Sequence, residues 1–80
     1  MKQYQNIQNA MEDLRRHGYL LRFIKRDKYF HCLDKNLNFC TYELNIEEAY
    51  RYEDKQEPGQ NTILYAIESA SYGIKGILVN

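Results

Sequence analysis

Tryptophan is absent from this 80-residue sequence, proline occurs once, glycine four times and cysteine twice. So little glycine and proline, in a chain that is 44% hydrophobic, argues against a disordered or low-complexity protein. The polar N-terminal stretch has no apolar signal core. Two cysteines in such a chain indicate reduced thiols, so we expect a cytoplasmic protein rather than a disulfide-rich secreted one.

The chain also lacks net charge, because eleven Lys and Arg residues balance eleven Asp and Glu residues. Proteins dedicated to nucleic acids or anionic membranes normally cluster cations. No run of residues approaches the ~20 apolar positions of a membrane-spanning helix. A near-neutral surface instead favours self-association. We therefore expect a protein partner or a second copy of the chain, with nucleic acid a less favoured partner and no membrane.

The length allows one domain, spanning residues 1–80. A domain of this size buries a smaller fraction of its surface than a large one, which leaves little room for an enclosed active site. We expect a shallow groove or partner surface, with no cofactor. The sequence ends inside the apolar run "IKGILVN" without a stop signal, so we also expect the natural protein to continue past Asn80.

Apolar residues recur every three or four positions between residues 6 and 17, which predicts an amphipathic helix. Asn6 is a suitable N-cap, and Gly18 suits the left-handed C-terminal stop. From Tyr19 onward the period is two. "YLLRFIKRD" and "KYFHCLD" therefore read as strands joined by a tight turn at Asp27-Lys28.

A second turn, placed at Lys35-Asn36, leads into "FCTYELNI". Residues 41–53 fit either a strand or a short helix, and the β-rich "YRY" favours the strand. "TILYAIES" is apolar on both faces and should be interior, whereas Lys75 suggests that the last strand lies at an edge or has an exposed face. The fold class is α+β: one N-terminal amphipathic helix packed on a four- to five-stranded, mainly antiparallel sheet.

Four short motifs, "MEDLRRHGY", "ELNIEEAYRYE", "ILYAIES" and "KGILVN", occur in this order and are spread along most of the chain. In them the sequence resembles a family of small uncharacterised bacterial proteins, common among Bacteroidetes, that are often labelled phosphoribosylpyrophosphate synthetase. Enzymes of that class are several times longer and hold ribose phosphate with a glycine- and threonine-rich loop. The four glycines here are isolated. The resemblance therefore implies a shared fold and transfers no catalytic residue.

The segment "AYRYEDKQEPGQNTILYAIES" supports two interpretations. In the first it is an anion or nucleotide site, with Arg51 as bidentate donor, Tyr50 or Tyr52 as stacking face and Glu53 as polar anchor. In the second it is a hairpin turned at Pro58-Gly59. Arg51 and Glu53 then share the solvent face, while the two tyrosines pack against the core or the helix. We favour the hairpin and keep Arg51 as the residue to test.

Residues 14–28, "LRRHGYLLRFIKRDK", form the one basic cluster of the sequence. If Arg15, Arg22 and Arg26 converged, they could bind single-stranded nucleic acid together with exposed tyrosines.

His31, Cys32 and Cys40 do not have zinc-ligand spacing, so we expect no metal. A Lys35-Asn36 turn would set His31 opposite Cys40, which is a conceivable nucleophilic pair without an orienting third group. The favoured hypothesis is a non-catalytic interaction or regulatory module. The alternative is a weak nucleic-acid or anion binder that uses residues 14–28 or Arg51.

Overall fold

The computed structural model describes residues 6–53 and 61–80, and it begins with the predicted helix. Helix α1 spans Ile7–Arg16. The side chain of Asn6 caps it by accepting a hydrogen bond from the backbone N–H of Asn9 at 2.9 Å. Gly18 ends it with a φ of +95°, a conformation that glycine adopts without a Cβ penalty. The helix and both of its ends confirm the sequence pattern.

In the described residues, six strands and one 3-10 helix follow α1. The six strands form a single sheet in the order β3-β2-β1-β6-β5-β4. Their bounds are β1 (Leu21–Lys25), β2 (Tyr29–Cys32), β3 (Leu37–Cys40), η1 (Thr41–Glu43), β4 (Asn45–Glu53), β5 (Asn61–Ser69) and β6 (Ile74–Val79). The α+β class is confirmed, but the expected count of four to five strands is too low. The short η1 divides the segment "FCTYELNI". The strands before and after it, β3 and β4, lie at opposite edges of the sheet.

The sheet is mixed rather than wholly antiparallel, because β1 and β6 pair in parallel with Phe23 opposite Leu78. The remaining pairs are antiparallel. This parallel contact makes β6 an interior strand, so the edge position inferred from Lys75 is wrong. Lys75 is instead half-buried on the face that carries the helix.

Of the two short hairpin turns predicted from the sequence, one is placed correctly and the other is not. Arg26 donates its backbone N–H to Tyr29 at 2.8 Å, which confirms the turn at Asp27-Lys28. In the second hairpin Cys32 lies opposite Leu37, so the turn is centred earlier than the predicted Lys35-Asn36. The left-handed conformation of Asn36, with a φ of 52°, closes that turn. The Pro58-Gly59 turn lies outside the described residues.

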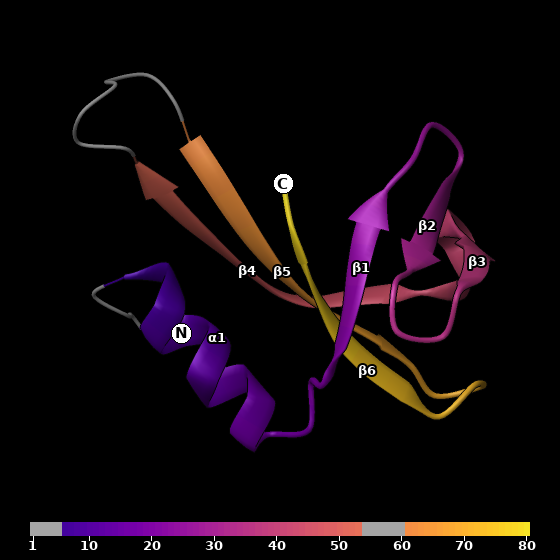
Figure 1. Ribbon diagram of the computed structural model, residues 1–80, viewed down its shortest axis with the longest axis horizontal. Coiled ribbons are helices and arrows are strands. Elements are labelled where there is room, and N and C mark those ends of the chain that lie inside the picture. The colour runs from indigo at the N-terminus through magenta and orange to yellow at the C-terminus, as the bar shows by residue number, and fades with distance from the viewer. Residues whose placement is uncertain (1–5, 54–60) are drawn as a thin grey trace.

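The two edge strands are adjacent in the chain, and this forces the sheet to curl. Five residue steps separate Cys40 at the end of β3 from Asn45 at the start of β4, a reach of at most about 18 Å. In a flat sheet, five strand spacings of ~4.8 Å would hold the edges about 24 Å apart. Figure 1 shows β4 running toward β3 at one end, whereas at the other end β4 and β5 diverge from β1 and β2.

The curled sheet has two apolar faces. The helix face carries α1 over β4, β5 and β6, and Figure 1 shows α1 on the side of the molecule away from β2 and β3. Its buried residues are Ala10, Leu14, Tyr19, Tyr50, Leu64, Ala66 and Ile77. The inner face lies inside the curl. Its buried residues are Phe23, Phe30, Cys32, Phe39, Leu44, Ile67, Ile74 and Leu78.

One end of the inner face is closed by contacts between the β5–β6 turn and η1. The Tyr72 hydroxyl donates to the Glu43 carboxylate, which also accepts the backbone N–H of Cys40 at 2.8 Å. The Tyr72 ring packs edge-on against Phe39, with ring centroids 5.3 Å apart. Because of these contacts, the curl is held shut where β3 meets β4.

Candidate binding sites

The sheet separates the residues of the predicted anion site. Tyr50 is buried opposite Leu64 on the helix face, and Tyr52 packs on the same side. Arg51 lies opposite Ile63, with its side chain on the inner-face side and exposed, and Glu53 follows on that side. Neither tyrosine can therefore stack on a ligand that Arg51 holds. The arrangement agrees with the hairpin interpretation, which the alternation of the strand already indicated.

The predicted basic cluster is not a continuous set of free cations. The backbone N–H of Arg22 donates to Asp34 Oδ2 at 2.7 Å, and its guanidinium Nη2 donates to Oδ1 at 3.1 Å. The side-chain hydrogen bond between these two residues raises the pKa of Arg22 and lowers the pKa of Asp34. Arg15 lies in the last turn of α1, and Arg26 lies at the β1–β2 turn. Arg22 is thus already paired and does not offer a free guanidinium beside them.

The histidine and cysteine residues also stand apart. His31 lies opposite Asn38, and its Nδ1 is 2.6 Å from the Asn38 side-chain oxygen. Cys40 lies opposite Tyr29, so the predicted pairing of Cys40 with His31 is wrong. Cys32 is buried and Cys40 is exposed. Within residues 6–53 and 61–80, no three His, Cys, Asp or Glu side chains gather as a metal site would require.

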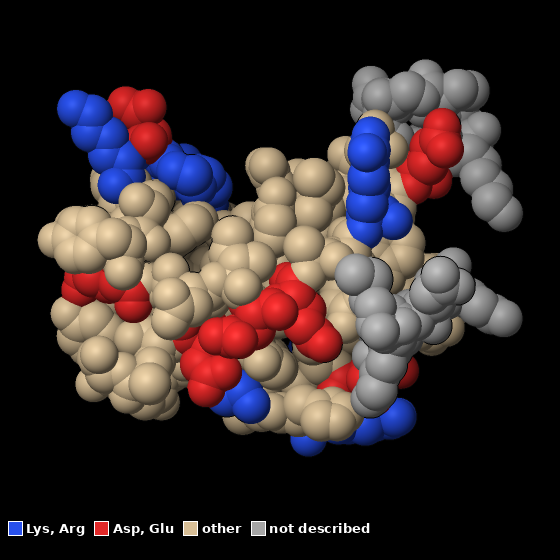
Figure 2. All heavy atoms as spheres, turned by 180° about the vertical axis from the view of Figure 1, so that it is seen from behind, with Lys and Arg blue, Asp and Glu red and all other residues tan. Residues whose placement is uncertain are grey.

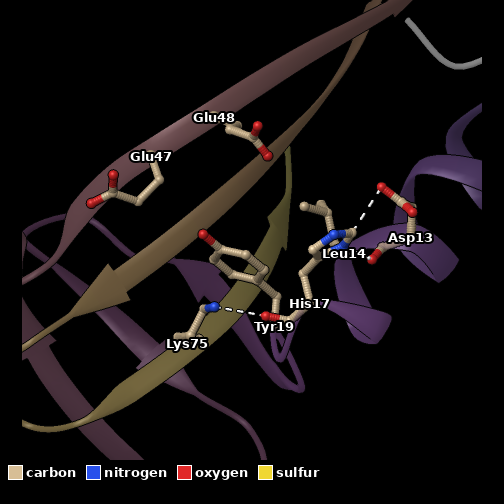
Figure 3. Close-up of a pocket in the computed structure, with 7 residues that line it drawn as sticks. All are labelled: Asp13, Leu14, His17, Tyr19, Glu47, Glu48 and Lys75. Carbon is tan, nitrogen blue, oxygen red and sulfur yellow. Dashed lines mark hydrogen bonds and ion pairs between the residues drawn. The ribbon is translucent and has the colours of Figure 1, made fainter. Parts of the chain in front are cut away.

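The described residues line several hollows, and the sequence did not predict which residues would line them. One hollow, of about 350 Å³, lies at the closed end of the inner face and is lined by Lys35, Leu37, Asn38, Phe39, Glu43, Tyr72 and Ile74. Two others differ from each other in chemistry. The larger, which we call the acidic pocket, has a volume of about 380 Å³ and lies between the C-terminal end of α1, β4 and β6. Its lining residues are Asp13, Leu14, His17, Tyr19, Glu47, Glu48 and Lys75. Figure 3 shows the two glutamates on β4 on one side of the pocket, with Asp13 and His17 of the helix end on the other.

A bulge in β4 places both glutamates at the pocket. The register of β4 against β5 shifts between Ile46, which lies opposite Ile67, and Glu48, which lies opposite Ala66. Glu47 is the extra residue, and a bulge of this kind re-aims side chains that would otherwise alternate between the two faces. Successive carboxylates therefore reach the same hollow, which strict strand alternation does not predict.

Lys75 and Tyr19 fasten the helix end to the sheet beside these carboxylates. The Lys75 ammonium donates to the carbonyl oxygen of His17 at 2.6 Å and lies 4.3 Å from the centroid of the Tyr19 ring. Burial raises the pKa of the Tyr19 hydroxyl first, and the negative charges of Glu68, Glu48 and Glu47 raise it further. Tyr19 therefore stays a neutral phenol, and the contacts around it hold α1 on the sheet.

The smaller hollow, which we call the open trough, lies on the inner face at the end where the sheet does not close. It has a volume of about 130 Å³ and is lined by Lys25, Phe30, Ile46, Tyr65, Ile67, Leu78 and Asn80. Phe30, Ile67 and Leu78 form its buried floor. Ile46 keeps 54% of its surface exposed. The lining is therefore mainly apolar and is contributed by both arms of the curled sheet, with β6 between them.

The two hollows carry opposite charge. Among the described residues, three carboxylates and Lys75 line the acidic pocket, whereas Lys25 is the one charged side chain that lines the open trough. The Lys25 ammonium donates to the carbonyl oxygen of Arg26 at 3.0 Å and lies 5.4 Å from the centroid of the Phe30 ring. On the face drawn in Figure 2, Asp and Glu gather across the middle, and Lys and Arg lie on the two raised ends and along the lower edge, with further acidic side chains on the raised ends.

Comparisons of the chain with protein-family models, with curated proteins and with solved structures give no match. The family resemblance seen in the sequence therefore stays a prediction. In the described part of the chain, no helix has the length and apolar character needed to cross a bilayer.

Proposed function

We propose that this chain is a non-catalytic interaction module that binds an apolar segment of a partner protein in the open trough. The observation that carries the proposal is an uncovered apolar hollow on a sheet whose other face is covered by the chain's only described helix. Concave, mainly apolar hollows with a few polar groups are the usual form of a binding site. A sheet that is apolar on both faces needs cover on both. Helix α1 covers one face, the curl of the sheet covers part of the other, and the trough is the part that stays open.

The size of the trough favours a protein segment over a metabolite. Pockets for small molecules usually measure ~300–1,000 Å³. A volume of about 130 Å³ is close to that of the engineered ~150 Å³ cavity that accepts a single benzene. The trough therefore suits one or two side chains of a longer segment. The acidic pocket is larger, but its known contacts tie the helix to the sheet and indicate no ligand.

Catalysis has little support from the geometry. The one cysteine–histidine pair that the sequence suggested is not formed, because Cys40 lies opposite Tyr29 and His31 opposite Asn38. The anion site is divided between two faces of the sheet, and Arg22 of the basic cluster is paired with Asp34. Nucleic-acid binding stays the alternative prediction, and binding to a mixed single-stranded oligonucleotide in low salt would favour it over the trough.

A fluorescent apolar probe tests the proposal directly. We expect anilinonaphthalene sulfonate to bind the folded protein and brighten, and Ile46→Gln to weaken that binding. Leu20→Gln is the matched control, because Leu20 is 67% exposed and does not line the trough. Both side chains are largely exposed, so neither change should unfold the protein. Binding that is absent, or that Ile46→Gln and Leu20→Gln reduce equally, would contradict the proposal.

A further inference from the structure

We infer that the segment bound in the open trough carries carboxylates beside its apolar side chains. This inference rests on the proposed function, because it names the chemistry of the partner at the same surface. The first ground is Lys25, which lines the trough and whose ammonium makes its described hydrogen bond to the backbone carbonyl of Arg26, not to a carboxylate. An ammonium has three donors, so Lys25 retains donors for an incoming acid.

The second ground is the pairing of β4 with β5 beyond the trough. On the inner face of these strands Ile46 lies opposite Ile67, Ala49 opposite Tyr65 and Arg51 opposite Ile63. This apolar ladder leads from the trough to the exposed guanidinium of Arg51. A segment lying along it would meet Lys25 on one arm of the sheet and Arg51 on the other.

The third ground is the distribution of carboxylates between the two faces. The bulge in β4 sends Glu47 and Glu48 to the helix face, and Glu68 also acts there on Tyr19. On the inner face Glu43 is engaged by Tyr72 at the closed end, and Glu53 stands beyond Arg51 at the far end of β4. Of the residues that the structure describes, no acidic side chain lines the trough between them. A segment flanked by acids is therefore complementary to the trough, whereas one flanked by bases is not.

Two labelled peptides test this inference. They share one apolar core of leucine, isoleucine and phenylalanine, and they are flanked on both sides by glutamates or by lysines. The formal net charge of the whole chain is zero, so any preference reports local charge. We expect fluorescence anisotropy in low salt to show the glutamate peptide binding about three- to tenfold more tightly, and higher salt to reduce the difference.

Substitutions assign the preference to the two cations. Lys25→Gln and Arg51→Gln should each lower the affinity for the glutamate peptide about two- to fivefold. Arg15→Gln on the outer side of α1 removes the same charge away from the trough and should leave the affinity unchanged. Ile46→Gln should weaken both peptides if both use the trough. A lysine peptide that still binds after Ile46→Gln is bound elsewhere, such as at the acidic pocket.

The outcomes separate the inference from the proposed function. Equal affinity of the two peptides, both weakened by Ile46→Gln, would overturn the inference and leave the interaction surface standing. Tighter trough binding by the lysine peptide would also overturn it. If neither peptide nor the fluorescent probe bound, the proposed function itself would fail. A dimer in light scattering that Ile46→Gln dissociates would show that a second copy fills the trough, which would overturn the acidic segment as occupant.

Discussion

The helix face and the inner face of the sheet are built from the same strands but are covered in different ways. On β5, Leu64 and Ala66 pack under α1, while Ile67 packs inside the curl with Leu78 of β6. The helix is a separate element that covers its face completely at those positions. The curl covers the inner face only where η1 draws β3 and β4 together, and it leaves the trough at the opposite end.

This difference teaches how a short chain can keep a binding surface. Exposed apolar area normally costs stability, because burying it is the main driving force of folding. Here each face supplies a buried cluster, and the floor of the trough belongs to the inner one. The exposed rim of the trough at Ile46 can then remain apolar without being needed for folding. Substitutions on the two faces should therefore separate stability from binding.

The largest expected effect is on the helix face. Leu14 is 2% exposed and lies on the buried side of α1, so Leu14→Ala should lower the free energy of unfolding by about 2–5 kcal/mol through the cavity it leaves. Ile46→Ala in the trough should change it by less than about 0.5 kcal/mol. Urea titration of both variants gives the comparison, and equal losses would show that the trough is part of the folding core.

The next largest loss of stability is expected at Gly76, on the inner face. A Cβ added at Gly76 would lie 2.4 Å from Phe23 Cε2 and 2.5 Å from the carbonyl oxygen of Leu21. Gly76→Ala should therefore strain the parallel β1–β6 pair and cost about 1–3 kcal/mol by overpacking. Gly73→Ala is a contrasting change, since a Cβ there meets no atom within 4 Å and the strain comes from its φ of +63°. Chemical denaturation that left Gly76→Ala as stable as the parent would contradict the β1–β6 pairing.

A smaller effect is expected where the helix is fastened to the sheet. Lys75→Met keeps a long side chain but removes the hydrogen bond to the His17 carbonyl and the ammonium over the Tyr19 ring. We expect a loss of about 0.5–2 kcal/mol. Amide hydrogen exchange should then accelerate in the last turn of α1 and not in β2 or β3. Uniform acceleration throughout the sheet would argue against a local fastening.

The smallest effect concerns the contact that closes the curl. The Tyr72 hydroxyl, followed by the Cys40 N–H, lowers the pKa of Glu43. A carboxyl whose pKa is lower in the folded state stabilises the fold above its ordinary pKa, and this contribution is lost as the pH falls through the lowered value. Tyr72→Phe should weaken that acid dependence. Melting temperatures measured from neutral to acid pH check it, and an unchanged acid slope would contradict the contact.

Local features of the fold were predictable, and distant pairings were not. Neighbouring residues alone determine the helix ends at Asn6 and Gly18 and the turn at Asp27-Lys28. Strand alternation also placed Tyr50 and Arg51 correctly on opposite faces. The parallel pairing of β1 with β6 joins segments more than fifty residues apart and leaves no local pattern in the sequence.

The curl, the Glu47 bulge and the trough share that origin. Each depends on how β3 and β4, which are neighbours in sequence, come to occupy opposite edges of one sheet. Strand alternation could show that β5 is apolar on both faces. It could not show which face the single helix would cover, nor that a bulge would turn Glu47 and Glu48 toward the same hollow.

The central claim is that a partner segment binds in the open trough of the inner face and not on the helix face. Titrating the glutamate-flanked peptide into isotope-labelled protein, and following the backbone amide signals by NMR, tests it most directly. The account predicts saturable shifts at Phe30, Ile46, Tyr65 and Leu78, with Ala10, Leu14 and Ala66 nearly unmoved. Shifts centred on the helix face, or no shifts at peptide concentrations that saturate the anisotropy signal, would contradict it.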